Sequence, residues 1–176
     1  MRMFRNIFKI KSIVLLFLTF CPGIYLTQEC LARTEFALPD SLSQKKEDLN
    51  FRLLLAADAG DQQEVLRLLN LGADVNTRDA DGVTPLMFAS EQGHLNVVKT
   101  LVINGADINL KPKNGIGAFT SAVRARRFDI VEYLWEKGAN VDETDNDLLT
   151  PLLHAVAYTD VPMTRLLLDL KADLEK

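Results

Sequence analysis

The chain has 176 residues, of which 48% are hydrophobic and 25% charged, and its formal net charge is −4 at pH 7. This length and apolar content suit a single globular domain. A mildly acidic chain lacks the cationic surface that general nucleic-acid binding requires, so we expect no nucleic-acid partner.

The first 32 residues are predicted to be a secretory signal peptide. The stretch MRMFRNIFKIK carries four basic residues and no acid, and the apolar run SIVLLFLTF follows it. A basic start, a short apolar core and a small-residue end are typical of such peptides, and cleavage fits after Ala32 or, second, after Gly23. The alternative is a membrane anchor, but residues 13–26 number only 14 and include Pro22, whereas a spanning helix needs about 20 apolar residues. We expect a secreted or periplasmic protein, with a membrane-anchored one as the alternative.

Both cysteines, Cys21 and Cys30, lie in this segment. Cleavage after Ala32 would therefore leave a mature chain without cysteine. Such a chain needs no disulfide outside the cytoplasm and offers no thiol for catalysis.

One sequence unit returns every 33 residues, after a polar, proline-containing linker predicted at 33–45. GADVN at 72–76 returns as GADIN at 105–109 and as GANVD at 138–142, with a weaker copy at 171–174. Single alanines keep the same phase, namely Ala56, Ala89, Ala122 and Ala155. A fixed period of this length indicates a repeat architecture, which divides into the units 46–78, 79–111, 112–144 and 145–176.

Each unit is predicted to form two helices followed by a hairpin-like turn. Thr84 can cap the first helix, Pro85 suits its first position, and Gly93 can end it in a left-handed conformation. The second helix carries an apolar stripe of Val97, Val98, Leu101 and Val102. One unit cannot bury this stripe alone, whereas stacked units can, so the sequence predicts an all-α solenoid.

The period and the words TPL, GH and GADVN resemble ankyrin repeats over residues 46–176. The resemblance implies helix-turn-helix pairs with hairpin-like turns, and a concave face of first helices and turn tips that binds another protein. The histidine of the family's TPLH word is replaced in every unit, by Leu54, Met87, Thr120 and Leu153, so we expect its Thr–His bond to be absent. Repeat phase places on the predicted concave face Asp58, Ala80, Asp81, Val83, Glu91, Gln92, Lys113, Asn114, Ile116, Arg124, Ala125, Asn146, Asp147, Leu149, Ala157 and Tyr158.

No catalytic, cofactor-binding or metal-binding residue is predicted. His94 and His154 are the two histidines, and they fall at different places in different units. Neither lies in a ligand cluster with the short spacing of a zinc site, and phosphate-loop, GxSxG and HExxH motifs are missing. His94 is expected in the turn between two helices, and Asp74 and Asp107 recur with the repeat as turn residues. We therefore expect a protein without catalysis or cofactor.

The third unit departs most from the pattern. Gly117-Ala118 replaces Thr-Pro, and Arg126 stands where a helix-ending glycine is expected. A left-handed arginine costs about 1–2 kcal/mol, so we expect the first helix to end differently here. The unit also gathers Lys111, Lys113, Arg124, Arg126 and Arg127. These form either a solvated charged patch or a contact site for an acidic partner surface, with Arg124 and Lys113 facing the groove.

The last unit carries Leu166, Leu167, Leu168 and Leu170, whereas the first offers Gln62, Gln63 and Glu64. Because end units normally have a polar outer face, the array is either shortened or covered at this end by a partner or a second copy. We expect a monomer, with self-association through the last unit as the alternative. Two other functional readings stay open: a membrane-tethered scaffold, and a degenerate array without a partner.

Overall fold

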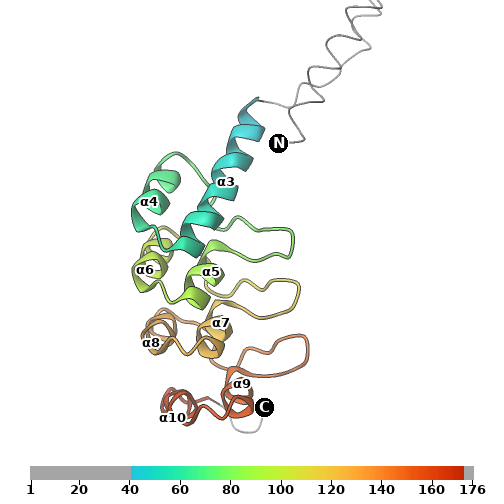
Figure 1. The fold of residues 1–176 in the computed structure, drawn as a ribbon. Helices are drawn as coiled ribbons and strands as arrows, with labels where there is room; N and C mark the ends of the chain where they lie inside the picture. Colours follow the sequence, from blue (N-terminus) through green and yellow to red (C-terminus); the bar gives the residue numbers. More distant parts are fainter. Residues whose placement is uncertain (1–40, 173–176) are drawn as a thin grey trace, which may run out of the picture. The chain divides into compact units, whose positions relative to one another are not determined.

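The computed structural model describes residues 41–172, and all regular secondary structure within that range is helical. The helices follow one another in pairs (Figure 1). They are α3 (Ser41–Ala59), α4 (Gln62–Asn70), α5 (Pro85–Gln92), α6 (Leu95–Ile103), α7 (Ala118–Arg124), α8 (Phe128–Glu136), α9 (Pro151–Ala157) and α10 (Val161–Asp169). The predicted all-α fold is confirmed.

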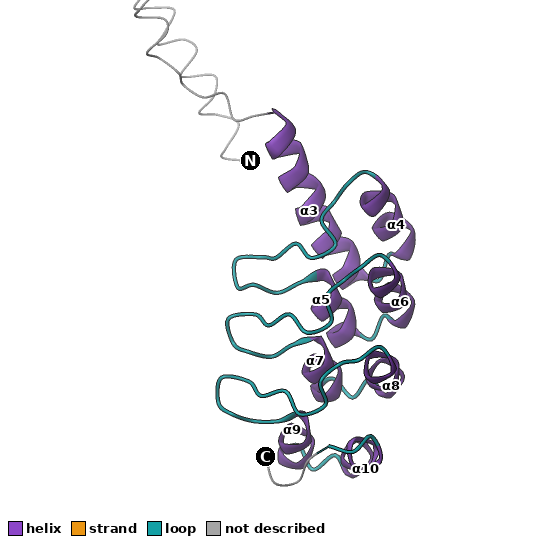
Figure 2. Cartoon of the chain, turned by 180° about the vertical axis from the view of Figure 1, so that it is seen from behind, coloured by secondary structure: helices purple, strands orange, loops and turns teal. Residues whose placement is uncertain are grey.

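The helix pairs stack in two rows. The inner helices α3, α5, α7 and α9 form one row, and the outer helices α4, α6, α8 and α10 form the other. Hairpin loops join each pair to the next and extend from the side of the inner row that faces away from the outer row (Figure 2). Each inner helix packs against the inner helix that precedes and follows it, so the core is continuous along the stack.

The alanines of the repeat line the contact between successive inner helices. Ala56, Ala89, Ala122 and Ala155 are only 7%, 0%, 0% and 2% exposed, one on each inner helix. A methyl side chain lets neighbouring helices approach closely, which is why this position stays small. The predicted stripe of the second helix is also buried, with Val97, Val98 and Leu101 at 1%, 0% and 0%.

Threonine caps begin two of the inner helices, as predicted. The Oγ1 atom of Thr84 accepts a hydrogen bond from the Met87 N–H at 3.4 Å, and that of Thr150 accepts one from the Leu153 N–H at 3.3 Å. Each cap satisfies one of the amide groups that a helix leaves unpaired at its start. Pro151, like Pro85, occupies a first-turn position where its missing N–H costs nothing.

The inner helices all end through a left-handed residue, which corrects the expectation for Arg126. Gly60, Gly93, Arg126 and Thr159 stand 33 residues apart, with φ of 74°, 91°, 60° and 52°. In each case the next amide bonds back to the core alanine, as Arg127 N does to Ala122 O at 2.9 Å. The third unit therefore keeps the shared geometry with an arginine. The ion pair from Arg126 Nε to Asp160 Oδ2, at 2.6 Å, offsets part of the backbone cost.

The first helix is longer than predicted. Helix α3 begins at Ser41, inside the segment 33–45 that was predicted as a linker. Residues 41–59 contain no glycine or proline and include good helix formers such as Gln, Lys, Glu and Leu, so nothing in the sequence stops the helix from extending. The predicted signal peptide and the start of that linker lie outside the described residues.

Within residues 41–172, no helix has the length and apolar character needed to cross a membrane.

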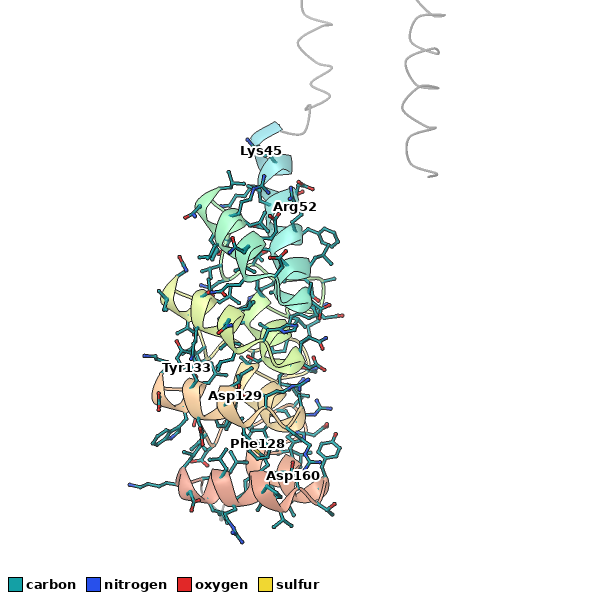
Figure 3. The ribbon with its side chains drawn as sticks, turned by 60° about the vertical axis from the view of Figure 1, so that its left-hand side comes forward. Lys45, Arg52, Phe128, Asp129, Tyr133 and Asp160 are labelled. Carbon is teal, nitrogen blue, oxygen red and sulfur yellow. The ribbon has the colours of Figure 1, made fainter. Side chains whose placement is uncertain are left out.

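The two ends of the stack differ in polarity. At the first pair, Arg52 of α3, which is labelled in Figure 3, forms an ion pair with Glu64 of α4 at 2.6 Å. At the last pair the four leucines of α10 and its C-cap differ in exposure. Leu167 is buried in the core, Leu168 is 40% exposed, and Leu166 and Leu170 are half-buried. The side chain of Val156 on α9 is 53% exposed, whereas its counterpart Val123 on α7 is 2% exposed. The apolar end predicted from the sequence is thus present on α9 and α10.

Candidate functional site

Two grooves lie on the face formed by the inner helices and the hairpin loops. We name them the α3 groove and the α5–α7 groove after the helices that line them. Neither is lined by a residue of an outer helix. This face is the one that repeat phase predicted to be concave.

The α3 groove has a volume of about 630 Å³ and runs between α3 and the first hairpin loop. Its apolar lining residues are Phe51 and Leu55, which are 60% and 54% exposed, together with Leu54, Phe88 and Ala80. The other lining residues are Glu47, Asn50, Asp58, Thr77, Arg78 and Asp79. Of the residues predicted for the concave face, only Asp58 and Ala80 line this groove.

Sequence reasoning missed Phe51 and Leu55. A signal was present, because Phe51, Leu55 and Asp58 follow one another at i, i+4 and i+7, a line of neighbours on one helix face. That line is separate from the buried stripe that contains Leu53, Ala56 and Ala57, so α3 has apolar residues on two faces.

The α5–α7 groove is smaller, about 360 Å³, and more polar. It brings together seven of the predicted positions, contributed by α5, α7, the first and second hairpin loops and the end of α9. These are Val83, Glu91, Asn114, Ile116, Arg124, Ala125 and Tyr158, joined by Met87, Pro112 and Ser121.

The remaining predicted positions line neither groove, and several hold neighbouring units together instead. Lys113 N donates to Asp81 O at 2.8 Å, and the Lys113 ammonium lies 3.7 Å from the Asp81 carboxylate. The Asn146 amide donates to Lys113 O at 2.6 Å, which links the next loop tip in the same way. Gln92 Nε2 donates to Asp58 Oδ1 at 2.8 Å. The others are Asp147, Leu149 and Ala157, on or after the third hairpin loop.

The basic residues of the third unit do not form one patch. The Lys111 ammonium donates to Thr144 O at 2.6 Å, Arg126 pairs with Asp160, and Arg127 Nε donates to Glu91 O at 3.1 Å. Of the pair predicted to face the groove, Lys113 is engaged with Asp81. Arg124 lines the α5–α7 groove, and within residues 41–172 it makes no hydrogen bond or ion pair.

Two buried polar contacts occupy the region where the family's Thr–His bond is missing. Thr120 stands at the histidine position of the third unit, and its hydroxyl donates to Glu143 Oε1 at 2.5 Å. In the fourth unit His154, one residue past that position, lies 2.8 Å from Asp145 Oδ2 through Nε2. Neither carboxylate was singled out from the sequence.

Asp145 is held in its ionised form by its hydrogen bonds. Burial alone would raise the pKa of its carboxyl. However, this carboxylate accepts hydrogen bonds from the N–H groups of Leu149 and Asp147, and it is paired with the ring of His154. Together these interactions lower the pKa by more than burial raises it, so the pKa of Asp145 lies below its ordinary value of 3.8. The Asp145–His154 pair therefore orders the hairpin loop, and it faces neither groove.

The other histidine is also structural. His94 lies in the turn between α5 and α6, as predicted, and its Nε2 atom is 3.0 Å from Asp58 O in the preceding unit. Among the described residues, no three His, Cys, Asp or Glu side chains are grouped closely enough to hold a metal ion.

Comparison with known families gives one match. A family model described as ankyrin repeats (3 copies) matches residues 35–112 and again residues 104–176, which together cover most of the chain. None of the curated proteins compared with the chain matches it.

Proposed function

The chain belongs to the ankyrin-repeat family, whose members are generally protein–protein interaction modules, and we propose that it holds a partner protein against its inner helices and hairpin loops. Repeat proteins of this kind use the extended surface of the stack to bind. The partner would contact the α3 groove and the α5–α7 groove together.

One observation carries this proposal. The apolar side chains of Phe51 and Leu55 are more than half exposed, and they face a groove that has the volume of an ordinary ligand site. Exposed apolar surface that is gathered in a groove favours burial by a partner. The neighbouring α5–α7 groove supplies polar groups, among them Arg124 and Tyr158, that can fix the register of that partner.

We propose a role without catalysis or cofactor. Three buried acidic side chains of the described residues already have structural partners: Glu143 with Thr120, Asp145 with His154, and Asp160 with Arg126. A general acid or base needs a proton partner in a substrate site, whereas these groups connect loops and helices of the stack.

We also propose that the chain is exported. The support is the sequence of residues 1–32, with its basic start and short apolar core. Amino-terminal sequencing of the purified protein tests this. A start near Arg33 supports export by cleavage, whereas an intact segment 13–26 would favour the membrane-tethered scaffold.

The binding proposal is tested by crosslinking and affinity capture in the native compartment with the full chain. The double variant Phe51→Ser, Arg124→Glu changes one exposed residue in each groove, and the double variant Ile103→Ser, Glu132→Lys is the matched control on the outer helices. We expect the groove variant to lose a partner that the control retains. A partner retained equally by both would overturn the proposal. Absence of any partner together with a low melting temperature would favour a degenerate array.

Charge at the α5–α7 groove is tested separately. If the partner surface there is acidic, Arg124→Glu should slow association and flatten its dependence on salt, because steering by opposite charges is screened by ions. Unchanged association rates would assign Arg124 to the solvated surface.

A further inference from the structure

We propose that the α3 groove binds a segment of the partner in which two apolar side chains lie between basic residues. This inference rests on the proposed function and names the chemistry that one end of the binding face would recognise. The groove is the most apolar hollow on the inner-helix face of the described residues.

The groove exists because α3 is longer than the other inner helices. Those helices begin at Pro85, Ala118 and Pro151, which stand 33 residues apart and project back to residue 52. Helix α3 instead begins at Ser41, so Glu47 and Phe51 lie on an extension that has no counterpart in the later units. Phe51 stands at the position where Thr84 and Thr150 cap their helices. In α3 this position lies within the helix, and its side chain lines the groove.

The order of the lining residues along α3 indicates the chemistry of the ligand. Glu47, Phe51, Leu55 and Asp58 follow at spacings of four, four and three residues, so one face of α3 reads acid, apolar, apolar, acid. Exposure of Phe51 and Leu55 leaves room for apolar side chains between them and the hairpin loop.

The rim of the groove carries an excess of negative charge. Three acidic residues, Glu47, Asp58 and Asp79, and one basic residue, Arg78, are among its lining residues. None of the four is in an ion pair within residues 41–172. Asp58 accepts a neutral hydrogen bond from Gln92, and Asp79 accepts two from the N–H groups of its own loop. An uncompensated negative rim around an apolar floor is complementary to basic residues that flank apolar ones.

Helix geometry sets the distance between the basic residues. Glu47 and Asp58 are eleven positions apart on one helix, which is about 16 Å along its axis. A helical ligand would present cations at the same separation in sequence, whereas an extended ligand would place them about five residues apart, because a strand rises about 3.3 Å per residue.

Selection of a phage library of random linear peptides on the full chain tests the proposal, followed by fluorescence anisotropy of the selected peptides. We expect enrichment of Lys or Arg flanking Leu, Phe or Trp. Phe51→Ser should weaken binding at least tenfold, and Glu47→Lys should weaken it at low salt and reduce its salt dependence. Ile103→Ser, which changes a residue that is 79% exposed on α6, is the matched control and should leave affinity unchanged.

Circular dichroism of each variant establishes that it folds, which the exposure of Phe51 and Glu47 leads us to expect. Selected peptides that are acidic or uncharged, or binding that survives both Phe51→Ser and Glu47→Lys, would overturn the proposal. So would the failure to select any peptide. If a native partner is still captured through Arg124 while Phe51→Ser has no effect, binding of a partner to the inner-helix face stands, whereas its contact with the α3 groove and this inference both fail.

Discussion

The carboxylate of Glu143, in the third hairpin loop, caps α7, the first helix of the same unit, at Thr120. Glu143 Oε1 accepts hydrogen bonds from the Thr120 hydroxyl at 2.5 Å and from the Thr120 N–H at 3.2 Å. Thr120 lies in the first turn of α7, whose N-cap residue, Gly117, has no side chain to offer. A negative group at this end also interacts favourably with the helix dipole. The third unit therefore takes this cap from its own hairpin loop.

Removal of this carboxylate should destabilise the stack. Glu143→Ala leaves the Thr120 N–H and hydroxyl without their partner in a buried site, and we expect a loss of about 1–3 kcal/mol in the free energy of unfolding. Glu143→Gln should lose less, because its amide oxygen can still accept. Urea unfolding of the full chain measures this, with the exposed Glu132→Ala on α8 as control. Equal stability of Glu143→Ala and wild type would contradict the cap.

The effect of Gly117→Thr on the free energy of unfolding should change sign when Glu143 is replaced by alanine. A Cβ on Gly117 would lie 2.9 Å from Glu143 Oε2, so Gly117→Thr should destabilise the wild type. In Glu143→Ala the space is free and Gly117 has φ of −70°, so the new threonine can cap α7 as Thr84 caps α5. We expect a gain of about 1 kcal/mol there. A double-mutant cycle measures the coupling, and additive effects would show that the two residues act independently.

The fold could be predicted from the sequence because the same pattern occurs in several units. The period, the alanines and the Thr-Pro starts all pointed to the same stacked helix pairs, and the core alanines are where that interpretation required them. The Glu143 cap could not be predicted, since it depends on a loop side chain that reaches back to a helix 23 residues earlier in the sequence. Repeat phase predicts what units share, and Glu143 has no equivalent, as Thr77 and Leu110 stand at its phase.

The candidate site was predictable in part for the same reason. Seven predicted positions meet in the α5–α7 groove, because that groove is built from shared geometry. The α3 groove depends on the extension of α3 beyond the common helix start, which the assumed linker at 33–45 concealed. The basic residues of the third unit share a stretch of sequence, but the backbone directs Arg126 to Asp160 and Arg127 to Glu91.

A glycine at Thr159 should stabilise the protein. Thr159 ends α9 with φ of 52°, a conformation that is strained for a β-branched residue. Relief of about 1–2 kcal/mol of strain exceeds the extra chain entropy of glycine, so we expect Thr159→Gly to gain about 0.5–1 kcal/mol. Thermal unfolding measures this. Ala157→Gly, at the last residue of α9, is the control and should be destabilising, and a loss in both variants would show that Thr159 is unstrained.

Two substitutions at Arg126 separate its backbone cost from its ion pair. Arg126→Ala keeps the left-handed strain and removes the ion-pair partner of Asp160, whose side chain is 4% exposed and retains the hydrogen bond from the Met163 N–H. Arg126→Gly also removes the partner but relieves the strain. We therefore expect both to be less stable than wild type, with the glycine variant about 1 kcal/mol more stable than the alanine variant. Equal losses in urea unfolding would mean that φ of 60° costs nothing here.

The Asp145–His154 pair should make stability depend on pH in the acid range. Because the pKa of Asp145 is lowered in the folded state, its ionised carboxylate stabilises the fold above the unfolded value of about 3.8, and this contribution is lost as pH falls through the folded pKa. Asp145→Asn should therefore be less stable than wild type at pH 7, by about 1–2 kcal/mol, and should lose less stability below pH 3.8.

Urea unfolding of both proteins at a series of pH values between neutrality and the acid range tests this last prediction. Asp147→Asn is the control, because the Asp147 side chain is exposed although its N–H donates to Asp145. It should follow the wild-type pH dependence. If Asp145→Asn also followed the wild-type curve below pH 3.8, the acid sensitivity would arise from other carboxylates, and the buried pair would contribute through neutral hydrogen bonding alone.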